Sequence, residues 1–134
     1  MATIFSKIVN GDIPSYKIAE TEDFYAFLDI RPLAKGHTLV IPKREVDYIF
    51  DLSDGEYTGL HLFAKKIAAA IKEVIPCERI GMAVVGLEVP HAHIHLVPIN
   101  EIADMSFEKK RVELSSDEFA EIATQIGKKV SSSY

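Results

Sequence analysis

One cysteine among 134 residues limits the chemistry that is open to this chain. A single thiol cannot close an internal disulfide, and it cannot supply a zinc site built from several cysteines. Cys77 follows Pro76, which we expect to end a helix, and we interpret this cysteine as an unreactive thiol. Any chemistry is therefore expected to rest on other side chains.

The sequence also lacks an excess of positive charge and long apolar runs. Fifteen Lys and Arg face twenty Asp and Glu, which gives a net charge of −5. This charge disfavours a broad nucleic-acid surface, because binding along a phosphate backbone uses clustered cations. A small phosphate ligand needs only a local site. No stretch approaches the apolar length of a membrane span, about 18 to 20 residues, so we expect no membrane partner and a soluble, cytoplasmic protein.

The length and the composition fit a single packed domain over residues 1–134. Hydrophobic residues make up 48% and charged residues 26% of the chain, which is ordinary for a globular protein and unlike a disordered one. A chain of this length buries enough surface for one hydrophobic core. The sequence thus predicts one domain.

Hydrophobic patterning predicts a mixture of strands and helices. Thr3 is expected to cap a short helical turn, and Ser-x-x-Glu patterns at Ser53 and Ser115 predict the first turns of two longer helices. These helices are expected over residues 53–75 and about 116–130. Short β-prone runs predict five strands, at residues 16–19, 24–28, 37–41, 81–85 and 91–97. This order predicts an α+β fold, in which helices cover one face of a mostly antiparallel five-stranded sheet.

Three of the five histidines alternate with apolar residues in the run 90–98. In a strand, alternate side chains share one face at steps of roughly 6.6–7 Å. The shared face would carry His91, His93 and His95, and the opposite face, against which helices can pack, would carry Ala92, Ile94 and Leu96. Imidazole has an ordinary pKa of about 6.5, so each ring is suited to act as a base, an acid, a nucleophile or a metal ligand.

Three interpretations of this row are open. The histidines are structural residues, although a buried face of three imidazoles would need several hydrogen-bond partners. Alternatively, His91 and His93 hold zinc together with the distant His37, since three imidazole nitrogens suit that ion. In the third interpretation, the central His93 is a nucleophile at phosphorus, because a phospho-imidazole adduct divides one hard displacement into two easier ones.

The sequence around the row resembles the histidine triad (HIT) superfamily of nucleotide hydrolases and transferases. The segment HAHIHLVP is similar to that family's His-x-His-x-His signature. The segments TIFSKIVNGDIPSYKI and FYAFLDIRPLAKGHTLVIPK resemble, in order and spacing, the N-terminal portion of its nucleotide-binding, Hint-like branch. The resemblance covers a core of about residues 3–98 and leaves a C-terminal extension, residues 99–134, outside it.

The resemblance implies an enzyme that acts on a purine nucleotide similar to AMP without a metal or another cofactor. His93 would attack the α-phosphorus of a nucleoside 5′-phosphoramidate or a related conjugate and form a nucleotidyl-histidine that water hydrolyses. His37 and His95 would flank the phosphate, and His91 would orient His93. The family commonly forms homodimers, so the implied protein partner is a second copy of the chain.

The resemblance also implies nucleotide contacts. Asp29 occupies the position that the family uses for ribose hydroxyls, and a carboxylate suits a vicinal diol because it accepts two hydrogen bonds. Alternatively, Asp29 only caps the loop that follows it. The apolar candidates for the base are Ile4, Phe5, Ile8, Phe27 and Ile30. His61 is instead expected on the surface of the long helix.

The chain departs from the family pattern just before the row. Many members carry polar side chains there that contact phosphate oxygens, whereas this chain has Leu87 and Glu88. A carboxylate repels a phosphate unless it is protonated or turned away, so Glu88 is expected to weaken phosphate binding or to face the leaving group. The extension after Pro98 also differs from the family's short tail, and we expect substrate choice to depend on it.

These observations leave alternatives to phosphoramidate cleavage. The same covalent intermediate would serve a dinucleoside polyphosphate hydrolase. The altered segment at residues 84–90 would suit a weakly catalytic, nucleotide-binding regulatory module. A zinc-binding protein would instead use His37, His91 and His93.

Overall fold

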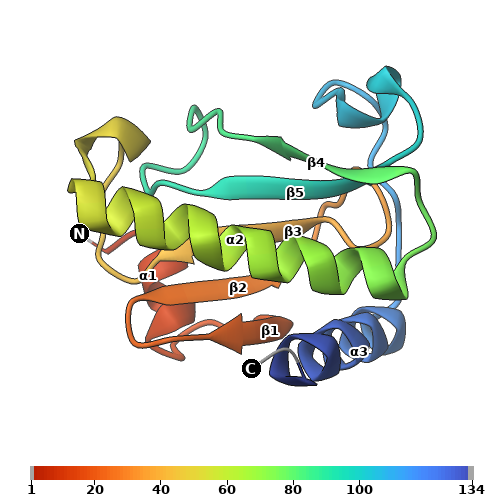
Figure 1. Cartoon of the computed structure of the whole chain (residues 1–134), viewed down its shortest axis with the longest axis horizontal. Helices are drawn as coiled ribbons and strands as arrows, with labels where there is room; N and C mark the ends of the chain where they lie inside the picture. The colour runs from red at the N-terminus through yellow and green to blue at the C-terminus, as the bar shows by residue number, and fades with distance from the viewer. Residues whose placement is uncertain (1, 133–134) are drawn as a thin grey trace.

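The computed structural model describes residues 2–132, and within them five strands form one antiparallel sheet in the order β1-β2-β3-β5-β4. The strands are β1 (Lys17–Glu20), β2 (Phe24–Leu28), β3 (Thr38–Pro42), β4 (Arg79–Ala83) and β5 (Ile94–Ile99). The first three strands are neighbours in chain order, whereas β5 lies between β3 and β4 (Figure 1). The predicted α+β fold is confirmed.

Two long helices pack against one face of this sheet. In Figure 1, α2 (Asp54–Val74) runs across the sheet and α3 (Ser116–Ser132) lies beside β1. The Ser53 hydroxyl accepts a hydrogen bond from the Glu56 N–H, as the capping pattern predicts. The buried side chains of both helices share one core with three residues of the histidine segment, Ala92, Ile94 and Leu96. The apolar side of that segment therefore faces the helices.

A smaller apolar cluster lies on the opposite face, under the short helix α1 (Ile4–Val9). It contains Phe5, Tyr25, Phe27, Leu39 and Ile41. The rings of Phe5 and Phe27 meet edge to face with centroids 5.5 Å apart, a favoured aromatic geometry. Thr3 caps the helix as predicted, since its Oγ1 accepts a hydrogen bond from the Ser6 N–H. The N-terminal helix thus forms a wall on the face that carries the histidines.

The strand that carries the histidine row begins later than the sequence predicts. β5 starts at Ile94, so the first two histidines precede it. The strand starts late because main-chain N–H groups before Ile94 bond to carbonyls outside the sheet. The His91 N–H donates to the Val89 carbonyl at 2.8 Å, and the Ala92 N–H donates to the Val46 carbonyl at 2.6 Å. The predicted fourth strand also shifts, from residues 81–85 to Arg79–Ala83.

The C-terminal extension returns to the histidine face before it forms α3. The chain also has two short 3-10 helices: η1 (Ile49–Asp51) precedes α2, and η2 (Ile102–Met105) lies within the extension. After η2, the Val112 N–H donates to the Pro32 carbonyl at 2.9 Å, and the Arg111 guanidinium donates to the Arg31 carbonyl at 2.8 Å. These bonds hold the extension against the loop that follows β2.

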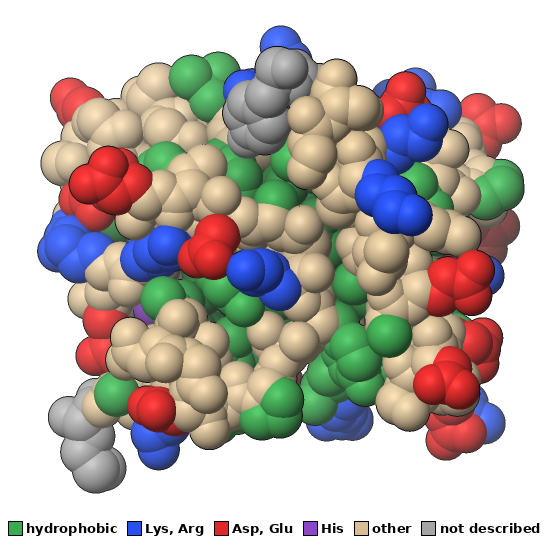
Figure 2. All heavy atoms as spheres, turned by 90° about the horizontal axis from the view of Figure 1, so that it is seen from below, with side chains coloured by type: hydrophobic (Ala, Val, Ile, Leu, Met, Phe, Trp, Pro, Cys, Tyr) green, Lys and Arg blue, Asp and Glu red, His purple; other side chains and the backbone are tan. Residues whose placement is uncertain are grey.

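The molecular surface carries charges of both signs. On the face seen from below in Figure 2, basic and acidic side chains are interspersed, with hydrophobic side chains visible between them. No helix within residues 2–132 is long and apolar enough to cross a membrane. His61 is partly exposed on α2, as expected, and its Nδ1–H donates to the Tyr57 carbonyl at 2.8 Å.

Candidate active site

A cavity of about 360 Å³ opens on the histidine face of the sheet. Its walls come from α1, the end of β2, the segment 85–89 and the C-terminal extension. The predicted site residues that line it are Ile4, Phe5, Ile8, Phe27, Asp29, Ile30, Glu88, His93 and His95. The other two, His37 and His91, are fully buried, with 0% exposure. The structure therefore gathers the predicted residues around one cavity, with two histidines behind its wall.

His93 presents an imidazole whose tautomer is fixed by the main chain. Its Nδ1 lies 2.8 Å from the His91 carbonyl oxygen. A carbonyl only accepts, so Nδ1 carries the proton and Nε2 is the unprotonated nitrogen of the neutral ring. The ring also meets Phe5 and His95 edge to face, at centroid distances of 5.1 and 4.8 Å. In this tautomer Nε2 carries the lone pair, on a ring that Phe5 and His95 both contact.

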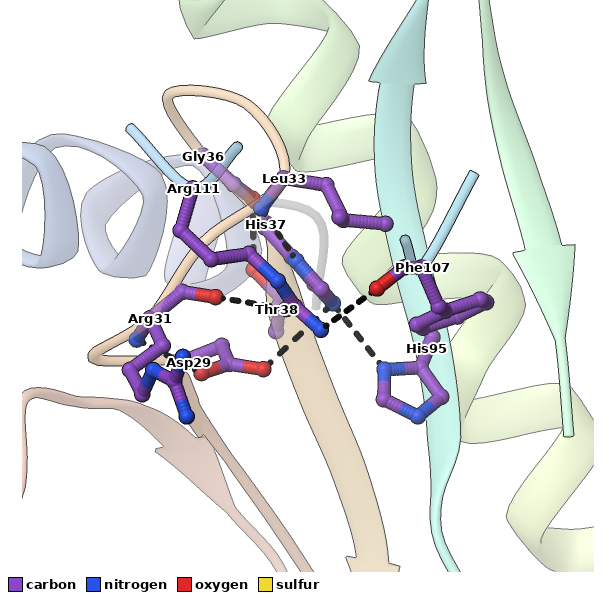
Figure 3. A network of polar contacts seen from close by, with 9 residues as sticks. All are labelled: Asp29, Arg31, Leu33, Gly36, His37, Thr38, His95, Phe107 and Arg111. Carbon is purple, nitrogen blue, oxygen red and sulfur yellow. Dashed lines mark hydrogen bonds and ion pairs between the residues drawn. The ribbon is translucent and has the colours of Figure 1, made fainter. Parts of the chain in front are cut away.

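His37 and His95 form a second fixed pair, shown in Figure 3. The Leu33 N–H donates to His37 Nδ1 at 2.9 Å, so His37 carries its proton on Nε2 and donates it to His95 Nδ1 at 3.0 Å. His95 must then carry its own proton on Nε2. Burial lowers the pKa of His37 to about 3 and that of His95 to about 4, so both rings are neutral at pH 7.

His91 is held between a carbonyl and a hydroxyl. Its Nε2–H donates to the Pro42 carbonyl at 2.8 Å, and its Nδ1 accepts from the Thr3 hydroxyl at 2.8 Å. Burial lowers the pKa of His91, which favours this neutral form. Glu45 Oε1 accepts from the Thr3 N–H at 2.7 Å and from the Ser6 hydroxyl at 2.8 Å. A network of four side chains thus connects the start of α1 to the histidine row.

Asp29 both caps a loop and lines the cavity. Its Oδ1 accepts from the Arg31 N–H at 2.8 Å, and its Oδ2 lies 3.7 Å from His37 Nε2 (Figure 3). Burial raises the pKa of this carboxyl. The loop-capping role that the sequence suggested is therefore present, and it leaves the carboxylate at the cavity wall.

The segment before the row offers the cavity no side chain with a strong hydrogen-bond donor. Val85, Gly86, Leu87, Glu88 and Val89 all line the cavity. Leu87 is 89% exposed, and Gly86 has a φ of 76°, in the left-handed region that favours glycine. The predicted departure at positions 87 and 88 is thus located beside the histidines.

Comparison with known proteins agrees with this geometry. The sequence profile of the HIT domain matches residues 10–102. The chain belongs to the HIT-domain family. Adenosine 5′-monophosphoramidase hnt1 of Schizosaccharomyces pombe is 36% identical over 132 residues, which cover 97% of this chain and 99% of that protein. Adenosine 5′-monophosphoramidase HNT1 of Saccharomyces cerevisiae is 41% identical over 98 residues, which cover 72% of this chain and 62% of that protein.

A solved structure of the family is similar to nearly the whole of this chain. The zinc-bound histidine triad family protein from Mycobacterium smegmatis is 30% identical and has a TM-score of 0.83, with 98% of this chain and 95% of that chain covered. The predicted resemblance to the superfamily is therefore confirmed by both sequence and fold.

The cavity of this HIT protein includes two residues beside the histidines, Phe107 and Arg111, that the sequence analysis did not predict. Phe107 meets His95 edge to face at a centroid distance of 4.8 Å, and Arg111 lines the same cavity. Both lie beyond residue 102, where the family match ends. They also lie outside any helix or strand, so periodicity gives no signal for them. A phenylalanine in a charged, irregular segment is the one available hint, because an aromatic side chain favours burial.

The structure changes the candidate metal set. Among residues 2–132, the His, Cys, Asp and Glu side chains that approach as a ligand group are Asp29, His37 and His95, whose donor atoms lie within 4.8 Å of one another. The set suggested by the sequence, which joined His91 and His93 to His37, is not among the described groups whose donor atoms come this close together. A metal ion at the assembled set would have to displace the proton that His37 shares with His95.

Proposed function

We propose that this HIT protein is a nucleotide hydrolase that cleaves nucleoside 5′-phosphoramidates through a covalent nucleotidyl-histidine on His93. The observation that carries the proposal is the bond from His93 Nδ1–H to the His91 carbonyl, 2.8 Å long. It leaves Nε2 free to attack while the ring stays in one tautomer. The two yeast relatives named adenosine 5′-monophosphoramidase support the choice of substrate.

The residues that line the cavity can accommodate the base, the ribose and the α-phosphate of a nucleotide. The apolar side chains from α1 and β2 offer a slot for a purine, which is a flat and largely apolar ring. Asp29 would accept hydrogen bonds from the ribose hydroxyls. The α-phosphate would then lie beside His93 and His95, the two histidines on the cavity wall. The hydrogen bond from His37 to His95 Nδ1 keeps the His95 proton on Nε2. This Nε2–H would donate to a phosphate oxygen.

The reaction divides into two displacements at phosphorus. In the first, the lone pair of His93 Nε2 forms a bond to the α-phosphorus while the P–N bond of the phosphoramidate breaks, and the leaving amine takes up one proton. In the second, a water oxygen bonds to phosphorus, the P–Nε2 bond breaks and the water proton is released. Both steps shift negative charge onto phosphate oxygens, where the His95 donor stabilises it.

His93→Ala tests this proposal directly. We expect wild type to release AMP from adenosine 5′-phosphoramidate and the variant to lose at least about 10³-fold in rate. A quench without acid should capture a nucleotidyl mass on His93 in wild type. His61→Ala, which removes a histidine from outside the cavity, is the matched control. Equal activity of wild type and His93→Ala would refute the proposed nucleophile.

Two further arms of this experiment separate the alternatives. Addition of a chelator should leave the rate unchanged, and a loss of activity would favour the metal set at Asp29, His37 and His95. Tight AMP binding without turnover would favour a regulatory module. Dinucleoside polyphosphates should be cleaved more slowly than the phosphoramidate if the proposed substrate class is right.

We also propose that the protein forms a homodimer through β4. This strand ends the sheet order, so its outer edge has no partner strand within residues 2–132. Met82 and Val85, at and just after this edge, are 56% and 51% exposed. Exposed strand edges with apolar side chains favour pairing with another chain. Light scattering should give twice the chain mass, and Met82→Lys should shift the mass toward that of one chain.

A further inference from the structure

The cavity of this HIT protein contains little positive charge for a phosphate ligand. His95 Nδ1 accepts a hydrogen bond from His37 Nε2–H at 3.0 Å, so the His95 ring offers the cavity a neutral N–H donor rather than a full charge. Two carboxyl groups, Asp29 and Glu88, line the same cavity. Among the lining residues that the structure describes, Arg111 is the only Lys or Arg. A nucleotide phosphate that enters this cavity therefore meets one permanent cation.

Arg111 is held by two main-chain carbonyls (Figure 3). One terminal nitrogen donates to the Arg31 carbonyl at 2.8 Å, and the other donates to the Phe107 carbonyl at 3.3 Å. Within residues 2–132, these bonds use two of the five N–H groups of the guanidinium. The anchoring fixes the position of the charge, and it leaves donors for a ligand.

The extension places this charge on the histidine side of the cavity. Phe107 meets the His95 ring at 4.8 Å, and the Arg111 guanidinium carbon lies 5.9 Å from the centroid of the Phe107 ring. Figure 3 shows the Arg111 side chain extending toward Asp29, His37 and His95. The phosphate of a bound nucleotide would lie beside His95 as well, so the guanidinium and the phosphate share one end of the cavity.

Arg111 also lies where the cavity meets a second groove. The residues common to both hollows are Ile30, Glu88, Phe107 and Arg111. The groove continues along Lys109 and Lys110, which do not line the cavity. A group bonded to the phosphate would leave the cavity at this boundary, between one carboxylate and one guanidinium.

We propose that Arg111 is a phosphate-binding and specificity-determining residue, which supplies from the C-terminal extension the phosphate contact that Leu87 and Glu88 do not offer. This inference rests on the proposed function for the ligand, a nucleoside 5′-phosphate, and for the position of its phosphate beside His95. It adds that the preference for a nucleotide over the free nucleoside comes from a segment outside the matched HIT region, residues 10–102.

Calorimetric titration with AMP and with adenosine tests the inference. Replacement of a charged hydrogen-bond donor should weaken AMP binding about 10- to 100-fold in Arg111→Gln, with adenosine affinity unchanged. Arg111→Lys keeps a point charge and should retain part of the preference. Lys110→Gln, which removes a cation from the groove alone, is the matched control and should bind both ligands as wild type does.

Each result has a distinct meaning. If Arg111→Gln and Arg111→Lys both bind AMP as tightly as wild type, Arg111 is not the phosphate contact. An equal loss of AMP and adenosine affinity would show that Arg111 only anchors the extension, which also refutes the inference. A wild type that prefers AMP through Arg111 but never hydrolyses a phosphoramidate would refute the proposed function and leave this inference standing. A wild type that binds no AMP would contradict both.

Discussion

The two histidine pairs of the site differ in what connects their members. His37 and His95 are joined by a direct hydrogen bond of 3.0 Å between rings, with the Leu33 N–H fixing the first ring. His91 and His93 are joined through the main-chain carbonyl of residue 91, at 2.8 Å from His93 Nδ1. One pair is therefore coupled through side chains, and the other is coupled through the backbone.

This difference separates two roles for a buried histidine. The His37 side chain determines the tautomer of His95, so its replacement changes a group that lines the cavity. The His91 carbonyl survives any replacement of the His91 side chain, whose ring nitrogens bond instead to Pro42 and Thr3. His37 is thus expected to matter mainly for activity and His91 mainly for stability.

His37→Leu should have the larger effect on activity. It removes the donor that holds the His95 proton on Nε2, so His95 is free to present an unprotonated nitrogen to the phosphate. We expect kcat/KM for phosphoramidate hydrolysis to fall about 10²-fold, with circular dichroism unchanged. An unaltered kcat/KM in a folded variant would show that the hydrogen bond from His37 does not determine how His95 acts.

His91→Leu is the matched replacement in the other pair. We expect kcat/KM to fall less than about 10-fold, because the carbonyl bond to His93 remains. The free energy of unfolding should fall by about 1–3 kcal/mol, since the buried Pro42 carbonyl loses its donor. Chemical denaturation of the two Leu variants measures this contrast. A larger activity loss in His91→Leu than in His37→Leu would reverse the comparison.

The sequence predicted the parts of the fold that depend on regular patterns. Ser-x-x-Glu at Ser53 marks a helix start because the chemistry of the cap is local. The predicted start of β5 was wrong. The alternation of histidine and apolar residues cannot reveal that the Ala92 N–H bonds to the Val46 carbonyl, 46 positions away in the chain. Strand bounds depend on such distant partners, and hydrophobic periodicity does not contain them.

The same limit applies to the site. The histidines and Asp29 were predicted because a motif and a resemblance place them together. Phe107 and Arg111 reach the cavity only because the Val112 N–H bonds to the Pro32 carbonyl at 2.9 Å, which turns an irregular segment back over the loop. Nothing in the spacing of residues 99–115 indicates that contact. The roles of all these residues remain predictions.

The pH dependence of the free energy of unfolding should reflect the protonation of His37 and His95, the pair joined through side chains. The pKa values of His37 and His95 are about 3 and about 4 in the native state, below the value of about 6.5 for an unfolded chain. The unfolded chain therefore binds protons that the native protein excludes as pH falls. The free energy of unfolding should decrease from pH 6.5 toward 4, by up to about 1.4 kcal/mol per pH unit for each ring.

The contribution of His37 and His95 can be isolated by comparing how steeply stability falls with pH in wild type and in His37→Leu. The raised pKa of Asp29 opposes the trend, because the native carboxyl binds its proton at higher pH than the unfolded one does. Glu56, whose pKa the Arg44 guanidinium lowers to about 2, contributes only below the ordinary carboxyl range. Denaturation midpoints between pH 6.5 and 4.5 should therefore fall less steeply in His37→Leu than in wild type. Parallel slopes would show that the buried pair does not titrate as expected.

The smallest effect is expected at the outer end of the backbone-coupled pair. Glu45 is exposed and binds the Thr3 N–H and the Ser6 hydroxyl, and Thr3 in turn donates to His91. Glu45→Ala should lower the free energy of unfolding slightly, because its bonds to Thr3 and Ser6 are lost, and raise KM about two-fold, because α1 carries part of the apolar slot. Asp47→Ala, a nearby exposed carboxylate, is the control. Hydrogen exchange at residues 4–9 should rise in Glu45→Ala alone, and equal exchange in both variants would show that Glu45 does not hold α1 against the histidine row.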